Sequence, residues 1–369
     1  MKIVGPKAYI HTDRLKINLQ NVRSHVGDKP LMCVVKANGY GHGALSIAKV
    51  ISNEPGIIFC IFSIDEALEL RRGGIKNDIL VFSRIQPDWL DQALDNDLWI
   101  NVSHQDDLQA LKDYHDKTGS CPIMHIKFDT GMTRLGFDGW EAESVFQFLC
   151  ENPHLPVEGI YSHFATADEG DLSYAEFQLN QFNKIVGKAN EAGIDFKYVH
   201  CSNSGAVLNL PHSYFNAVRV GMLMYGVAPS DEVAMDVDVE PVMSFCGTIV
   251  NVRRVKAGTQ VSYGGVYTTQ SDTNIAVVQM GFADGFPRPW YENGYVSYKG
   301  QHYKIAGRAC MDQIMVDFGD VGPSEGEEVL IFGKKDGNRI PVETIAVEIG
   351  TTTYVLLTAV QGRTERIVL

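Results

Sequence analysis

Short apolar segments alternate with amphipathic helical segments between about residue 30 and residue 226, and this alternation constrains the fold more than any other feature. Continuously apolar strands separated by helices are typical of parallel strands that are buried on both faces. The strand-like segments cover residues 31–36, 57–62, 79–82, 98–102, 123–128, 157–164, 198–201 and 218–225. Eight such units over roughly 200 residues predict an α/β fold, a (β/α)8 barrel of the TIM type.

An open, doubly wound parallel sheet is the alternative to the barrel. That fold needs fewer strands and usually places a glycine-rich phosphate loop after its first strand. Residues 39–43 are glycine-rich and follow a strand, but Tyr40 stands between the first two glycines and no acidic partner for a ribose follows at the expected distance. The barrel is therefore the better interpretation.

The sequence changes character after Tyr225. A polar connection over residues 229–241 leads into short alternating segments at 247–252, 275–280, 295–298, 314–318 and 328–332, which are separated by turn residues. Such a pattern predicts a mainly β domain. We therefore expect a barrel domain over residues 1–236 and a β domain over residues 237–369.

Composition excludes several classes of partner. The chain has 369 residues, 45% of them hydrophobic, and a formal net charge of −13, which argues against binding to a nucleic-acid backbone. No run of about 18 apolar residues and no signal peptide are evident, so neither a membrane partner nor export is expected. The seven cysteines form no Cys-x-x-Cys pair, which indicates reduced thiols, a cytoplasmic location and no metal site.

One lysine stands where a barrel places its chemistry, at the carboxyl end of a strand. Lys36 ends the first strand and follows an apolar run, and desolvation makes a lysine amine nucleophilic. By itself, a lysine at a strand end more often only extends its amine to solvent. The residues that follow Lys36 favour a functional role. Tyr40 and three glycines come within seven positions of it, and the glycines allow a bound group to approach the backbone closely.

The segments after the seventh and eighth strands supply a second element of the site. These two loops are the recurrent phosphate site of the fold. The first contains Asn203 and Ser204, and the second contains Arg219, Gly221 and Met222. A lysine on the first strand that faces a phosphate pocket predicts pyridoxal 5'-phosphate as the cofactor.

Residues 34–43, with the sequence VVKANGYGHG, resemble the cofactor-lysine signature of alanine racemases at every position. The resemblance continues through both predicted domains in the order of the family. It includes residues 127–136, 161–164, 217–221, 261–264, 281–285 and 307–312. The chain is therefore identified as a member of this family, which implies a barrel followed by a β domain and the interconversion of L- and D-alanine.

The resemblance also implies a role for each matching residue. Lys36 holds the cofactor as an imine and acts as one acid–base group, while Tyr263 from the partner subunit of a head-to-tail homodimer is the second. Arg219 contacts the pyridine nitrogen and His163 packs on the ring. The cofactor phosphate is contacted by Tyr40, Ser204, Gly221 and Met222, and Asn203 also belongs to the cofactor-binding residues. Arg134 and the backbone amide of Met311 meet the substrate carboxylate, and Lys127 is carbamylated in some members.

Two departures from the family pattern leave alternatives open. Phe282 stands where many members have a tyrosine on the substrate path, and Gly362 aligns with a pocket-lining tyrosine. A roomier pocket admits serine, since apolar pockets reject one added hydroxyl poorly. A serine/alanine or broad-specificity racemase is thus an alternative, as are a decarboxylase of the same architecture that uses Cys310 and a non-catalytic cofactor carrier. The usual purpose of the family is D-alanine for peptidoglycan.

Overall fold

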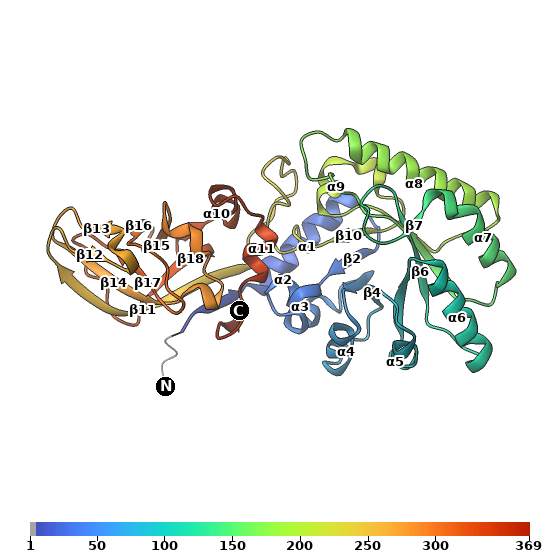
Figure 1. Cartoon of the computed structure of the whole chain (residues 1–369), viewed down its shortest axis with the longest axis horizontal. Helices are drawn as coiled ribbons and strands as arrows, with labels where there is room; N and C mark the ends of the chain where they lie inside the picture. Colours follow the sequence, from blue (N-terminus) through green and yellow to red (C-terminus); the bar gives the residue numbers. More distant parts are fainter. Residues whose placement is uncertain (1–4) are drawn as a thin grey trace.

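The chain forms two domains that lie side by side along the long axis of the molecule (Figure 1). A computed structural model describes residues 5–369. Helices surround the strands of one domain, while the other domain is a strongly twisted sheet with few helices. This arrangement confirms the predicted barrel followed by a mainly β domain.

Eight parallel strands form the sheet of the barrel. In spatial order they are β10 (Val218–Val220), β2 (Leu31–Val34), β3 (Ile57–Ile61), β4 (Ile79–Arg84), β5 (Leu98–Val102), β6 (Met124–Asp129), β8 (Val157–Tyr161) and β9 (Tyr198–His200). β9 and β10 are the two ends of this sheet, and between them Arg219 N donates a hydrogen bond to Ser202 O, two residues past β9, at 3.0 Å. A nearly closed ring brings all eight carboxyl ends to one mouth.

The barrel helices cover the outside of this ring. They are α1 (Thr12–Val26), α3 (Ala44–Ile51), α4 (Ile64–Arg72), α5 (Leu90–Asp95), α6 (Gln105–Thr118), α7 (Ala142–Glu151), α8 (Ser173–Glu191) and α9 (Ser204–Asn209). Their spacing of apolar residues explains the packing, as in α4, where Ile64, Ala67 and Leu70 are buried on one face. All residues of β2, β3 and β5 are buried, as expected for strands covered on both sides.

A nine-stranded sheet forms the core of the second domain. Its order is β19 (Asn338–Ile340), β18 (Glu328–Lys335), β15 (Tyr295–Tyr298), β16 (Gln301–Ile305), β17 (Ile314–Asp317), β14 (Thr273–Gln279), β11 (Met243–Val255), β1 (Lys7–Ile10) and β20 (Glu365–Val368). The small hairpin of β12 (Gln260–Val261) and β13 (Tyr267–Thr268) is attached at its far end. The division after residue 236 stays a prediction, and β1 joins this sheet although it precedes the barrel.

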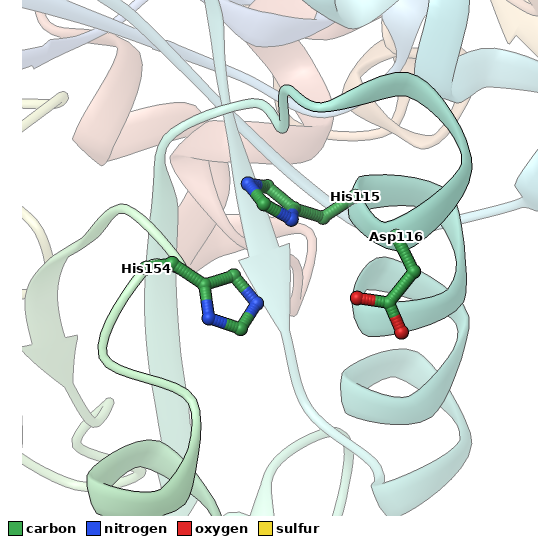
Figure 2. A group of neighbouring side chains, drawn as sticks. All are labelled: His115, Asp116 and His154. Atoms are coloured by element: carbon green, nitrogen blue, oxygen red, sulfur yellow. The ribbon is translucent and has the colours of Figure 1, made fainter.

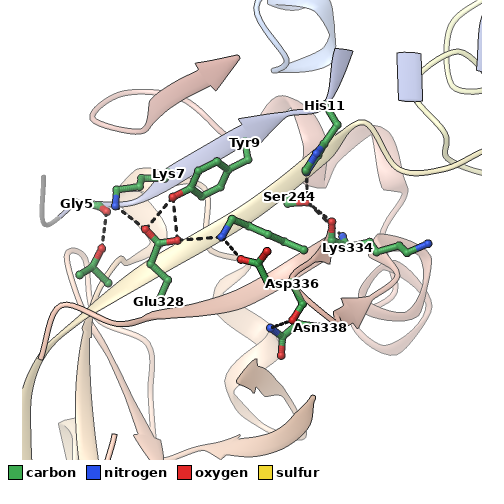
Figure 3. Close-up of polar contacts among 11 residues, drawn as sticks. Gly5, Lys7, Tyr9, His11, Ser244, Glu328, Lys334, Asp336 and Asn338 are labelled. Atoms are coloured by element: carbon green, nitrogen blue, oxygen red, sulfur yellow. Dashed lines mark hydrogen bonds and ion pairs between the residues drawn. The ribbon is translucent and has the colours of Figure 1, made fainter. Parts of the chain in front are cut away.

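Polar side-chain contacts link β1 and the residue after it to other strands of the nine-stranded sheet (Figure 3). The Lys7 amine lies 2.5 Å from Glu328 Oε1, and the Tyr9 hydroxyl donates to the same carboxylate at 2.8 Å. Directly after β1, His11 Nε2 and Ser244 Oγ are 2.9 Å apart. These side chains are largely buried. Their network joins the start of the chain to residues more than 230 positions away in the sequence.

Replacing Glu328 with glutamine is expected to lower the free energy of unfolding by about 1–3 kcal/mol at pH 7, the usual cost of unsatisfied buried donors. Burial alone would raise the pKa of Glu328, but hydrogen bonds from Lys7 and Tyr9 outweigh it and the pKa lies below its ordinary value. A lowered folded-state pKa stabilises the fold above the unfolded pKa of about 4.3, and this contribution is lost as the pH falls through the folded value.

Thermal unfolding followed by circular dichroism checks this expectation. The wild type should unfold at a higher temperature than Glu328→Gln at pH 7, and the gap should close below about pH 4. If the difference in unfolding temperature were the same at pH 7 and below about pH 4, the charge of Glu328 would not contribute to stability.

None of the helices between residues 5 and 369 is long and apolar enough to cross a membrane.

Candidate active site

The predicted residues of the barrel domain gather at the mouth formed by the carboxyl ends of the strands. Lys36 lies two residues past the end of β2, Lys127 is in β6, and His163 lies two residues past β8. Ser204 follows β9, and Arg219 is in β10. The strand ends therefore bring residues that are up to 183 positions apart in the sequence to one region, as the parallel barrel requires.

The backbone after Lys36 is held in an unusual conformation. Five successive residues have positive φ, with values of 52° at Ala37, 53° at Asn38, 62° at Gly39, 49° at Tyr40 and 80° at Gly41. Such a run is costly for residues other than glycine and persists only when the surroundings impose it. The first strand thus ends at Val34, two residues earlier than the sequence pattern predicts, and Lys36 begins the left-handed turn labelled α2 (Lys36–Tyr40).

Glu66 anchors the start of this left-handed turn. Its Oε1 accepts a hydrogen bond from Ala37 N at 2.6 Å, and its Oε2 accepts from Phe62 N at 2.9 Å and from Ser63 N at 3.2 Å. The same glutamate closes the capping box of α4 with Ser63. One carboxylate therefore couples the helix that follows β3 to the residue next to Lys36, a role that the sequence analysis missed.

The environment of Lys36 favours a nucleophilic amine. Burial lowers its pKa, and the positive charge of Arg134 lowers it further, while Glu66 opposes the shift. A lowered pKa increases the fraction of unprotonated amine, which is the form that attacks a carbonyl. The structure therefore supports the sequence-based expectation of a reactive lysine at this position.

Arg219 lies almost completely buried beneath the mouth. Its Nη1 donates to His200 Nδ1 at 2.7 Å and to His200 O at 3.3 Å. Its Nη2 donates to Ser162 O at 2.8 Å, to Cys201 O at 2.9 Å and to His163 Nδ1 at 3.0 Å. Because a guanidinium only donates, both histidine nitrogens accept here. These five acceptors use the terminal nitrogens and leave the Nε–H for another group.

The two histidines bonded to Arg219 are held neutral. Burial lowers the pKa of His163 well below its ordinary value, and the charge of Arg219 lowers it further. His200 shows the same direction for the same reasons. The ring of His163 is thus an uncharged surface at the mouth, which suits packing against an aromatic ligand and fits its predicted place.

Lys127 adds another cation to this region. Burial and the charges of Arg134 and Arg219 lower its pKa to about 8. Its amine lies 5.7 Å from the centre of the Tyr161 ring. Arg134 is exposed. It belongs to a loop that Asp129 organises, since the Asp129 carboxylate accepts hydrogen bonds from the backbone amides of Gly131, Met132 and Arg134, each at 2.8 Å.

The candidate phosphate contacts lie together beside β10. The Tyr40 hydroxyl approaches Gly221 so closely that a Cβ on this glycine would lie 3.2 Å from it. The Ser204 hydroxyl accepts from Gly221 N at 3.1 Å, and the adjoining Met222 is buried. Asn203 instead caps α9, where its Oδ1 accepts from Ala206 N at 3.0 Å. The hydroxyls of Tyr40 and Ser204 and the amide of Gly221 thus lie close together, and groups of this kind can donate hydrogen bonds to an anion.

Tyr354, which the sequence analysis did not single out, packs against Tyr40. Their ring centres are 5.9 Å apart, and burial raises the pKa of Tyr354. Gly362 lies elsewhere, in a turn where a Cβ would meet only Ala283 O, at 3.4 Å. Tyr354, rather than Gly362, thus lies beside Tyr40, one of the candidate phosphate contacts. The correspondence of Gly362 with a pocket-lining tyrosine, and the roomier pocket inferred from it, stay predictions.

The remaining predicted residues form a separate cluster on the β domain. Tyr263, Met311 and Phe282 are 68%, 55% and 41% exposed, which is high for large apolar side chains. Met311 O accepts a hydrogen bond from Ala283 N at 3.1 Å, which places it beside Phe282. Tyr263 follows Ser262, whose φ of 66° is again in the left-handed region.

The cluster of Tyr263, Met311 and Phe282 does not face the barrel mouth of its own chain. Tyr263 follows β12, which Figure 1 shows at the end of the β domain remote from the barrel. One chain thus holds the two predicted acid–base groups, Lys36 and Tyr263, in separate places. Exposed apolar side chains gathered on one surface are typical of a contact with another protein.

Family models cover nearly all of the chain. A model of the N-terminal domain of alanine racemase matches residues 10–229, and a model of its C-terminal domain matches residues 242–368. The alanine racemase of Desulforamulus reducens is 38% identical over 364 residues, which are 98% of each chain. Alanine racemase 1 of Bacillus subtilis is 35% identical over 98% of this chain and 92% of the relative.

Solved structures agree with these matches. The alanine racemase of Clostridium difficile 630 has a TM-score of 0.92 at 33% identity and covers all of this chain and 96% of that one. The Bacillus anthracis enzyme, solved with bound L-Ala-P, has a TM-score of 0.90 at 32% identity, with coverages of 100% and 95%. Alanine racemases depend on pyridoxal phosphate, and this chain belongs to the alanine racemase family.

Proposed function

We propose that this protein interconverts L- and D-alanine with pyridoxal phosphate bonded to Lys36, and that Lys36 and the partner's copy of Tyr263 are its two acid–base groups. The observation that carries the proposal is the placement of a lysine with a lowered pKa beside the buried, hydrogen-bonded Arg219 at the barrel mouth. The family membership of the chain supports the choice of reaction.

The residues at the mouth fit the cofactor. Tyr40, Ser204 and the amides of Gly221 and Met222 would hold its phosphate, His163 would pack on its ring, and the free Nε–H of Arg219 would face its pyridine nitrogen. Arginine keeps its protons at neutral pH, so this contact donates a hydrogen bond without protonating the ring. When bound, the cofactor withdraws electrons from Cα of the amino acid and makes its hydrogen acidic.

Racemisation needs a proton to leave one face of Cα and another to arrive on the opposite face, so two positioned groups are required. Lys36 serves one face, since burial and the charge of Arg134 lower its pKa and favour an amine that can accept a proton. The hydroxyl of the partner's Tyr263 serves the other face.

Tyr263 reaches this site only from a second subunit. We infer a head-to-tail homodimer in which the cluster of Tyr263, Met311 and Phe282 on one subunit covers the barrel mouth of the other. The exposure of these three side chains supports this assembly. In it, Arg134 of one subunit and the Met311 amide of the other bind the substrate carboxylate, the geometry for which arginine is suited.

Lys127 is proposed to be carbamylated. Its pKa of about 8 leaves part of the amine free to add carbon dioxide, which forms a carbamate and releases one proton. The new anion would replace the repulsion between Lys127 and Arg134 by attraction and so fix Arg134 for the substrate.

Incubation with 13C-labelled bicarbonate is expected to give one carbamate resonance per chain that is missing in Lys127→Met. Because only the unprotonated amine reacts, occupancy should rise as the pH increases through about 8. Identical spectra of wild type and variant would remove Lys127 from this role.

A supply of D-alanine for peptidoglycan and a cytoplasmic location complete the proposal. The first follows from the usual purpose of the family. The second is supported by the cysteines, all seven of which are free thiols, the state that a reducing compartment maintains.

Chiral product analysis tests the proposed reaction. Purified protein with pyridoxal phosphate should convert L-alanine to a mixture of both enantiomers and L-serine much more slowly. L-Lysine serves as the comparison, since release of carbon dioxide from it would indicate a decarboxylase. Absence of D-alanine under these conditions would contradict the proposal.

A further inference from the structure

Two histidines and an aspartate come together at the end of the barrel opposite to the mouth (Figure 2). His115 and Asp116 are in the last turn of α6, which leads to β6. His154 is in the connection from α7 to β8. One ligand atom from each side chain lies within 4.8 Å of the corresponding atoms of the other two. No spacing in the sequence indicates this group, because only the barrel topology joins residues 115 and 154.

We propose that His115, Asp116 and His154 bind a divalent transition-metal ion, with Zn²⁺ as the representative case. Imidazole nitrogens and a carboxylate oxygen are ligands that Zn²⁺, Ni²⁺ and Cu²⁺ accept. An ion among atoms spaced this way lies within about 2.8 Å of all three, and exposed side chains need only small rotations to reach bond lengths of about 2.0–2.2 Å. Water completes the coordination.

Local interactions already prepare these side chains. The centres of the two imidazole rings are 4.3 Å apart, and the ring planes are tilted by 43° to each other. Asp116 follows His115 in the last turn of α6, and its Oδ2 accepts a hydrogen bond from Lys112. Lys112 also competes for it, with its amine 2.5 Å from Asp116 Oδ2, but exposed ion pairs between lysine and aspartate are weak. A divalent ion held by two additional nitrogens should displace the lysine.

The position of the site indicates what a bound ion would do. β6 and β8 are neighbours in the barrel, so an ion here would join the connections that precede two adjacent strands. The site lies at the amino ends of the strands, where barrel proteins place determinants of stability rather than of catalysis. A bound ion should therefore raise thermal stability by mass action and leave turnover unchanged.

Titration of the chelator-treated, cofactor-loaded protein with Zn²⁺ and Co²⁺ tests this proposal. The unfolding temperature should rise with Zn²⁺ and turnover should stay constant. Co²⁺ should give the weak visible bands of a nitrogen- and oxygen-ligated ion. His115→Ala and His154→Ala should each weaken binding by about tenfold or more, the effect of losing one coordinate bond worth at least 1.4 kcal/mol.

His212→Ala is the matched control, because His212 is also an exposed histidine of the barrel domain beside a carboxylate, that of Glu176. It should bind Zn²⁺ as the wild type does. Three results would overturn the proposal: no thermal shift with Zn²⁺, an undiminished shift in His154→Ala, or strong near-ultraviolet charge-transfer bands with Co²⁺. The last would place the ion on a cysteine thiolate.

Discussion

Replacing Lys36 with alanine should abolish both the visible absorbance of the bound cofactor and the racemisation of alanine. The variant loses the covalent attachment and one acid–base group together, and an acid–base group alone typically contributes about 10²–10⁴-fold. We therefore expect turnover to fall by at least about 10²-fold and, in most assays, below the detection limit. Absorbance spectra and chiral analysis of the same preparation give both readings.

Lys49→Ala provides the control for this replacement, since Lys49 is an exposed lysine of the neighbouring helix α3. It should keep both the absorbance and the activity. If the absorbance survived in Lys36→Ala, the cofactor would be attached to another lysine, and Lys127, with its pKa of about 8, would be the first to examine.

Replacing Tyr263 with phenylalanine should leave the cofactor absorbance intact and lower turnover by about 10²–10⁴-fold. The hydroxyl is lost while the ring remains, and the residues proposed to hold the cofactor, among them Lys36, Tyr40 and Arg219, belong to the barrel and are unchanged. Exchange of the Cα hydrogen with deuterium should persist for one enantiomer of alanine and be lost for the other, because each base serves one face.

Tyr267→Phe is the matched variant for Tyr263→Phe. Tyr267 lies in the same hairpin, but its hydroxyl donates to Asp317 at 2.6 Å and has a structural role. It should change stability and keep turnover. Equal exchange of both enantiomers in Tyr263→Phe would assign the second proton transfer to another group.

The barrel was predictable from sequence because its strands are buried on both faces and appear as uninterrupted apolar runs. The β domain was predictable from turn residues and alternation. Strand ends were less accurate, and β2 stops at Val34 because the positive φ values from Ala37 onward turn the chain away. No local pattern marks such a turn when alanine and asparagine adopt it.

The parts of the site that sequence reasoning missed depend on contacts between distant elements. Glu66 reads as an ordinary helix-capping glutamate, and only the fold brings its second oxygen to Ala37 N. Tyr354 lies in the helix α11 (Thr353–Thr358), and its approach to Tyr40 depends on how the two domains meet. The separation of Tyr263 from Lys36 in one chain is likewise visible only in three dimensions.

A heterodimer of Lys36→Ala and Tyr263→Phe subunits, co-expressed with two different affinity tags and purified through both, tests the shared active site most directly. In a head-to-tail dimer one site carries both replacements, while the other combines an intact Lys36 with an intact Tyr263. We expect about half the wild-type activity per dimer, although both parent homodimers are nearly inactive. Activity no higher than that of the parents would contradict it and place both groups of each site on one chain.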